Sequence, residues 1–223
     1  MCLPVLFSCG LSKERAGRAE AHYKMGASYL SENKLQPAYV EFQKGIEIAP
    51  GNKEYHNALG IVHMRFTDYR KAEESFSKAI RIDKDYSEGY NNLCFLYYTE
   101  REWQKAVENC KKALNNPLYQ TPEKAFYNLG KAYYRLRMYD DAVRVYWEAL
   151  RRSPGLYIAY YEIALAHNAK GEYGNASAAL SKGIEFDPRF NGSRAVAESE
   201  FRSGKVKMDD PIDLKDMLDM FNY

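Results

Sequence analysis

The sequence has few cysteines, no long apolar run and no excess of one charge. Its 4 cysteines in 223 residues do not form a disulfide framework, and none shows the paired spacing of a zinc site. No stretch approaches the roughly 20 apolar residues that a membrane-spanning helix needs. Because 32 Lys and Arg face 30 Asp and Glu, net charge gives no reason to expect nucleic acid as a partner.

Motifs of catalysis are missing as well. The sequence contains no Gly-rich phosphate loop of the Walker type, no HExxH and no GxSxG. The acidic pairs at 140–141 and 209–210 fall at a predicted turn and before a predicted helix, where solvation and N-terminal capping account for them. We therefore expect a protein that is not an enzyme, with no cofactor, metal or small-molecule substrate.

What the sequence does have is an internal repeat. Small residues recur at spacings of 34, 34, 36 and 34 residues, and two further small columns and one bulky column keep the same register. Two antiparallel helices approach closely only where side chains are small, so these columns predict the contact line within each helix pair. The columns are Gly26, Gly60, Cys94, Gly130 and Ala164; Ala38, Ala72, Ala106, Ala142 and Ala176; Phe42, Phe76, Cys110, Tyr146 and Leu180; and Gly45, Ala79, Ala113, Ala149 and Gly183.

This pattern resembles the tetratricopeptide repeat (TPR), a helix–turn–helix unit that stacks on its neighbours. We expect an all-α fold, a right-handed TPR solenoid of five repeats over 19–190, with a partial sixth copy as a capping helix over 191–206. A large residue, such as Tyr69 or Trp103, ends each turn within a repeat. An amphipathic helix over 207–223 either folds back on the stack or docks elsewhere, and folding back is favoured.

Three of the repeated positions hold residues that need a separate interpretation. His63 and His167 stand where other copies have Tyr, so packing is favoured over metal binding. Cys94 and Cys110 fall on facing helices of one repeat. Buried thiols are the simplest interpretation, and an oxidising compartment could join them if the geometry permits.

The first ten residues contain Leu6-Phe7-Ser8-Cys9, which resembles the lipobox of bacterial lipoproteins. We interpret 1–9 as the remainder of a signal peptide with its lipobox, Cys9 as the lipidated residue and 10–18 as a polar tether. A basic region and most of an apolar core are missing before the box. The alternative is a frayed or packed apolar N-terminus.

The first helix of each TPR lines the concave face of the stack, so the repeat register predicts a protein-binding groove. Its lining is aromatic and rich in amides, which suits an extended or helical peptide. Packing between neighbouring units is the alternative for each residue. The predicted groove residues are Tyr23, Leu30, Asn57, Ile61, Met64, Asn91, Phe95, Tyr98, Tyr127, Lys131, Tyr134, Tyr161 and Leu165.

The lipobox, the TPRs and a lengthened third junction, Asn116-Pro117-Leu118-Tyr119, together resemble the PilF/PilW family of type IV pilus pilotins. The resemblance implies a lipid-anchored protein on the periplasmic side of the outer membrane that helps a secretin to assemble there. It also implies that the early repeats carry the binding surface.

Two other functions remain open: a general periplasmic TPR scaffold and a cytosolic TPR adaptor without lipid. The adaptor is disfavoured because the carboxylate clamp of co-chaperone TPRs is incomplete here. Asn92 and Lys124 match that clamp, but Ile61 and Asn128 stand where it needs Asn and Arg.

Overall fold

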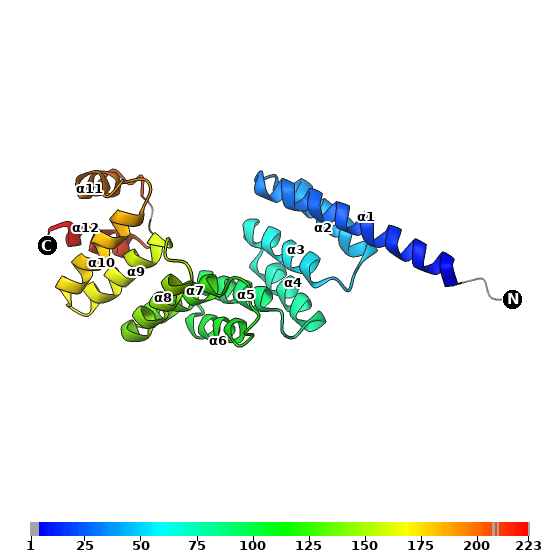
Figure 1. The fold of residues 1–223 in the computed structure, drawn as a ribbon, viewed down its shortest axis with the longest axis horizontal. Coiled ribbons are helices and arrows are strands. Elements are labelled where there is room, and N and C mark those ends of the chain that lie inside the picture. Colours follow the sequence, from blue (N-terminus) through cyan, green and yellow to red (C-terminus); the bar gives the residue numbers. More distant parts are fainter. Residues whose placement is uncertain (1–4, 207, 209, 223) are drawn as a thin grey trace. The chain divides into compact units, whose positions relative to one another are not determined.

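The computed structural model describes residues 5–206, 208 and 210–222, with side chains from residue 13 onward. Over these residues the chain is built from helices and has no strand, which confirms the all-α prediction (Figure 1). The elements are α1 Val5–Ser31, α2 Leu35–Ile48, α3 Lys53–Arg65, α4 Tyr69–Ile82, α5 Ser87–Thr99, α6 Trp103–Leu114, α7 Pro122–Arg135, α8 Tyr139–Arg152, α9 Tyr157–Ala169, α10 Tyr173–Phe186, α11 Arg194–Arg202, α12 Pro211–Asp219 and the short 3-10 helix η1 Met220–Asn222.

The turn inside each repeat is the same five times. The second helix begins at the large residue that the sequence predicted, and the turn before it contains one residue with positive φ. The residue after the positive-φ position donates its backbone N–H to the carbonyl five residues earlier. Examples are Asp68 to His63 at 2.9 Å and Met138 to Tyr133 at 2.9 Å. This hydrogen bond closes the first helix and sends the chain back along it. The positive-φ residues are Asn33, Thr67, Arg101, Arg137 and Gly171.

The small and bulky columns face each other as predicted. A Cβ added at Gly60 would lie 2.5 Å from the ring of Phe76, and one added at Gly130 would lie 2.4 Å from the ring of Tyr146. The alanines of the second small column are fully buried in all five copies. Glycine in the first column is therefore required by an aromatic ring against its backbone.

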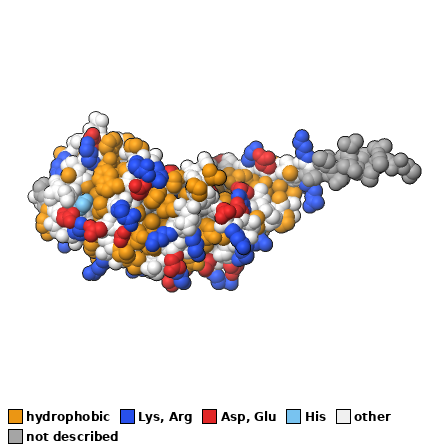
Figure 2. Space-filling view, turned by 60° about the horizontal axis from the view of Figure 1, so that its bottom comes forward, with side chains coloured by type: hydrophobic (Ala, Val, Ile, Leu, Met, Phe, Trp, Pro, Cys, Tyr) orange, Lys and Arg blue, Asp and Glu red, His pale blue; other side chains and the backbone are white. Residues whose placement is uncertain are grey.

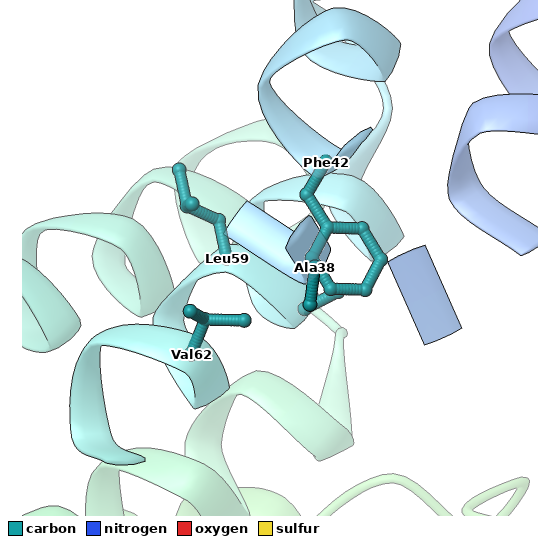
Figure 3. Packing of buried hydrophobic residues seen from close by; sticks show 5 residues of the cluster. Ala38, Phe42, Leu59 and Val62 are labelled. Atoms are coloured by element: carbon teal, nitrogen blue, oxygen red, sulfur yellow. The ribbon is translucent and has the colours of Figure 1, made fainter. Parts of the chain in front are cut away.

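The chain divides into two compact units within α5, one up to Leu96 and one from Tyr97. In unit 1, α1 packs on α2, α2 on α3 and α3 on α4. Figure 3 shows part of its core, where Ala38 and Phe42 of α2 lie close to Leu59 and Val62 of α3. This contact joins one repeat to the next, because α2 and α3 belong to successive copies.

Unit 2 contains the pairs α7–α8 and α9–α10 and ends in α11 and α12. Helix α11 lies within the predicted capping segment, and α12 packs against α9 and α11 while η1 contacts α10. The C-terminal helix therefore folds back onto its own unit, as favoured from the sequence. The side chains of Met217 in α12 and Met220 in η1 are fully buried there.

The N-terminal segment differs from its prediction. Residues 1–4 lie outside the described part of the chain, and so does the side chain of Cys9. Helix α1 begins at Val5, so the tether predicted over 10–18 is helical. The physical reason is composition, since Lys, Glu, Arg and Ala dominate this stretch and favour a helix. Among the described helices, none has the length and apolar character needed to cross a membrane.

Candidate protein-binding face

The apolar groove residues predicted in unit 1 are partly open to solvent. Ile61 and Met64 on α3 are half-buried, and Phe95 on α5 is 43% exposed. On α1, Tyr23 stacks on Tyr55 with ring centroids 5.0 Å apart, and Leu30 packs against the core cluster of α2 and α3. Among the predicted groove residues of this unit, the apolar side chains open to solvent therefore include Ile61 and Met64 on α3 and Phe95 on α5.

The two predicted amides of unit 1 are buried, and Asn57 joins neighbouring helices. Asn57 is 9% exposed, and its side-chain oxygen accepts a hydrogen bond of 2.8 Å from Asn92 Nδ2 on α5. Asn91 is similarly buried, at 8% exposed. The hydrogen bond between Asn57 and Asn92 holds α3 against α5. The Asn57 side chain, predicted to line the binding groove, therefore has a partner within the chain.

In the first part of unit 2, the predicted residues contact one another. Lys131 is 8% exposed, and its Nζ lies 4.2 Å from the ring centroid of Tyr98 and 5.8 Å from that of Tyr127. The Tyr127 hydroxyl donates to Glu162 at 3.2 Å. Burial raises the pKa of Tyr98, although the charges of Lys131 and Arg135 oppose that shift. These groups form a packed cation–π cluster on α5, α7 and α9.

Two predicted groove residues are part of the core. Tyr161 is 4% exposed and Leu165 is 1% exposed. The Tyr161 hydroxyl donates to Asp187 at 3.1 Å, and its ring meets Phe201 of α11 edge-on at 5.8 Å. The sequence prediction placed both residues on an open surface, and the structure corrects it because the C-terminal segment covers this end of unit 2.

Tyr134 and its neighbour Arg135 meet the C-terminal helix directly. Tyr134 donates to Asp213 Oδ1 at 3.4 Å, and Arg135 donates to both oxygens of the same carboxylate at 3.2 and 2.5 Å. Burial, followed by the charge of Asp213, raises the pKa of the Tyr134 hydroxyl. The pairing of Arg135 with Asp213 could not be predicted from the sequence, because no local pattern links residues 78 positions apart.

Histidine positions follow the packing interpretation. His63 is 7% exposed, its ring meets Tyr39 edge-on at 5.7 Å, and burial lowers its pKa. His167 lies 2.6 Å from a carboxylate oxygen of Glu172. Among the described side chains, no group of three His, Cys, Asp or Glu is placed to hold a metal ion. Cys94 and Cys110 are both fully buried.

Apolar side chains also reach the surface elsewhere. The face drawn in Figure 2 shows them among Lys, Arg, Asp and Glu. In unit 2, Trp147 is 49% exposed and meets Tyr160 edge-on at 5.8 Å, and Tyr160 in turn stacks on Phe186 at 5.6 Å. These rings come from α8, α9 and α10 and support one another at the surface.

Comparison with known families explains the architecture. Models of the tetratricopeptide repeat match residues 54–86, 123–156 and 157–190. The chain carries TPRs. The matched segments coincide with the helix pairs α3–α4, α7–α8 and α9–α10. TPRs generally act as non-enzymatic scaffolds that hold other proteins, which agrees with the interpretation of the concave face as a binding surface.

Solved structures show how far the TPR architecture extends along the chain. Pseudomonas aeruginosa PilF has 22% identity and a TM-score of 0.72, covering 91% of this chain and 97% of its own. PilW, a type IV pilus biogenesis factor, has 19% identity and a TM-score of 0.71, covering 90% and 98%. YrrB, a TPR protein with an unusual peptide-binding site, has 18% identity and a TM-score of 0.61, covering 90% and 98%. At these identities the likeness shows a shared fold. A comparison with curated proteins found no match.

Proposed function

We propose that this chain is a TPR lipoprotein, held by a lipid on Cys9 at the periplasmic side of the outer membrane, that guides a secretin during type IV pilus assembly. The repeats supply specificity for the client, and the acyl chains supply affinity for the membrane. Because the membrane anchor and the client-binding surface lie on one chain, delivery of the client to the membrane depends on both.

One observation carries the proposal: the open apolar surface on α3 and α5 of unit 1. Ile61, Met64 and Phe95 reach solvent there, whereas the corresponding end of unit 2 is covered. Contiguous exposed apolar surface is typical of protein-binding sites. The fold shared with PilF and with PilW, a type IV pilus biogenesis factor, over about nine-tenths of the chain supports a client in type IV pilus biogenesis.

Lipidation is tested by labelling cells with a fatty-acid probe. The wild-type protein and a Cys2→Ala variant should both take up the label, and Cys9→Ala should take up none. Cys2 is the matched control because it lies in the same segment without a lipobox before it. A wild type that stays unlabelled contradicts the anchor and favours a cytosolic adaptor.

The client is tested by capture from solubilised membranes. The wild-type chain should recover a secretin, and the double change Ile61→Asp, Met64→Asp should lose it because charge replaces the apolar surface. The control is Leu118→Asp with Val196→Asp, two residues of unit 2 whose side chains are 78% and 45% exposed. Circular dichroism should show that each variant keeps its helices.

The outcomes separate the remaining functions. Recovery of envelope proteins without any secretin would replace the pilus function with a general periplasmic scaffold. If the Ile61, Met64 variant recovers a secretin at the wild-type level, the client does not bind at the surface assigned to α3 and α5. Loss in the control pair as well would show that the capture responds to charge in general.

A further inference from the structure

The structure contains one example of how a concave TPR surface of this chain holds a helix. Helix α12 and η1 present four buried side chains, Asp213, Met217, Met220 and Phe221, which are between 0 and 8% exposed. Their spacing of 4, 3 and 1 residues places them along one side of a helix. An acidic residue thus precedes apolar residues at positions +4, +7 and +8. This side of the helix packs against the rest of unit 2.

The carboxylate of that helix is held by a cation from the concave surface. Arg135 donates to both oxygens of Asp213, and a second contact joins it to Asp210 at 3.6 Å. The Arg135 side chain is 17% exposed and that of Asp213 is 5% exposed. A bidentate pair with so little solvent fixes both the position and the direction of a docked helix.

The repeat places an equivalent surface in unit 1. Arg65 and Phe95 stand 70 residues before Arg135 and Leu165, which is two repeats in the register of the small columns. Leu165 is 1% exposed on α9, the helix against which α12 packs, but Phe95 is 43% exposed. Arg65 is exposed, and its Nη1 donates to Asn33 Oδ1 at 3.1 Å. Unit 1 therefore presents a cation and an apolar side chain to solvent at the positions equivalent to Arg135 and Leu165.

We propose that the α3–α5 surface of unit 1 binds an amphipathic helix of the client in which an Asp or Glu precedes apolar residues at +4, +7 and +8, with Arg65 holding the carboxylate. The inference rests on the proposed function and states which part of the client is recognised. Charge complementarity fixes the chemistry of the partner, and α12 supplies the pattern. Anchors at such spacings are typical of helices bound in grooves.

A synthetic peptide of residues 208–222 is the probe, and the full chain is the receptor. The peptide should bind the wild-type chain, and Arg65→Glu should weaken binding by about tenfold or more because like charges then meet. A peptide carrying Asp213→Arg should restore binding to the Arg65→Glu chain. Arg70→Glu on α4 is the matched control, since Arg70 is 79% exposed and is expected to leave binding unchanged.

Two further variants decide where the peptide binds. Phe95→Asp should also weaken binding of the peptide. Arg135→Glu should leave the affinity of the peptide for the α3–α5 surface unchanged. Binding that depends on Arg135 and is insensitive to Arg65 would mean that the peptide merely exchanges with α12, and it would overturn the inference. Absence of any peptide binding to the wild-type chain would overturn it as well.

Failure of this inference can be told apart from failure of the proposed function. A secretin that is lost with Ile61→Asp, Met64→Asp but is still captured by Arg65→Glu would keep the function and remove the helix recognition. A peptide that binds through Arg65 in a chain that captures no secretin would do the reverse.

Discussion

The concave surfaces of the two units share one repeat register but differ in what covers them. In unit 1, the side chains Ile61, Met64 and Phe95 reach solvent. In unit 2, Lys131 and Leu165 at equivalent positions are 8% and 1% exposed. Unit 2 also carries α12, which pairs with Arg135 and buries Met217. Among the described residues, α12 packs on α9 in unit 2, whereas side chains at the equivalent positions of unit 1 reach solvent.

A second pair of equivalent residues gives the same contrast. Asp83 and Asp187 both follow the second helix of a repeat, and each accepts a backbone N–H two residues later. Asp83 pairs with Lys53 and its side chain is 34% exposed, whereas Asp187 is fully buried with Arg189 and Tyr161 as partners. The aspartate of the pair is therefore fully buried in unit 2 and partly exposed in unit 1, although its partner Arg189 is itself 45% exposed.

The largest predicted effect on stability comes from removing an aromatic ring that packs on a glycine, a contact found in both units. Phe76→Ala in unit 1 and Tyr146→Ala in unit 2 should each lower the free energy of unfolding by about 3–5 kcal/mol, because both rings are fully buried against a glycine. Urea unfolding followed by circular dichroism measures this. A loss below about 1 kcal/mol in one unit would show that the contact between ring and glycine is not equivalent in the two units.

Next in size are substitutions of the glycines themselves. Gly130→Ala places a Cβ against the ring of Tyr146 and should destabilise the chain by about 1–3 kcal/mol. Gly174→Ala is the matched control, since nothing lies within 4 Å of its added Cβ, and it should stabilise by about 0.4–1 kcal/mol. Thermal unfolding of both variants shows whether each substitution raises or lowers the stability. A change in the same direction for both would contradict the close approach of the helices at Gly130.

The contrast between the two aspartates is tested by pH. Burial alone would raise the pKa of Asp187, but hydrogen bonds from Arg189 and Tyr161 outweigh it and hold the pKa below its usual value. A lowered pKa means that this stabilisation is present above about pH 4, the unfolded value, and is lost as the pH falls through the folded pKa. Asp187→Asn should therefore cost about 1.5–3 kcal/mol at pH 7 and progressively less at lower pH.

The equivalent change in unit 1 should be smaller. The hydrogen bond from Lys53 lowers the pKa of Asp83, but solvent reaches this pair, so Asp83→Asn should cost no more than about 1 kcal/mol at pH 7. Unfolding curves at pH 7 and pH 3.5 for both variants make the comparison. Equal losses at pH 7 would show that covering by the C-terminal segment does not matter.

Local rules predicted the repeat and its contacts well. The close approach of Gly60 to Phe76, the start of α6 at Trp103 and the packing of His63 all follow from side-chain size and periodicity within one repeat. Such features depend on residues less than one repeat apart. They can be predicted because helical spacing alone decides which side chains meet.

The covered surface could not be predicted in the same way. The register of α9 places Tyr161 and Leu165 on the concave side, and the sequence gives no local sign that α11 and α12 return to bury them. The partner of Arg135 is likewise set by a contact across 78 residues. Burial by a distant segment is a tertiary effect, so exposure of a predicted groove residue requires the structure.

The central claim, that unit 1 holds a protein on its concave surface, is tested most directly by photo-crosslinking in cells. A photoreactive amino acid at Ile61 should form a crosslink to an envelope protein, and one at Arg81, exposed on α4, should form none. Crosslinks of equal yield from both positions, or from Arg81 alone, would contradict the account.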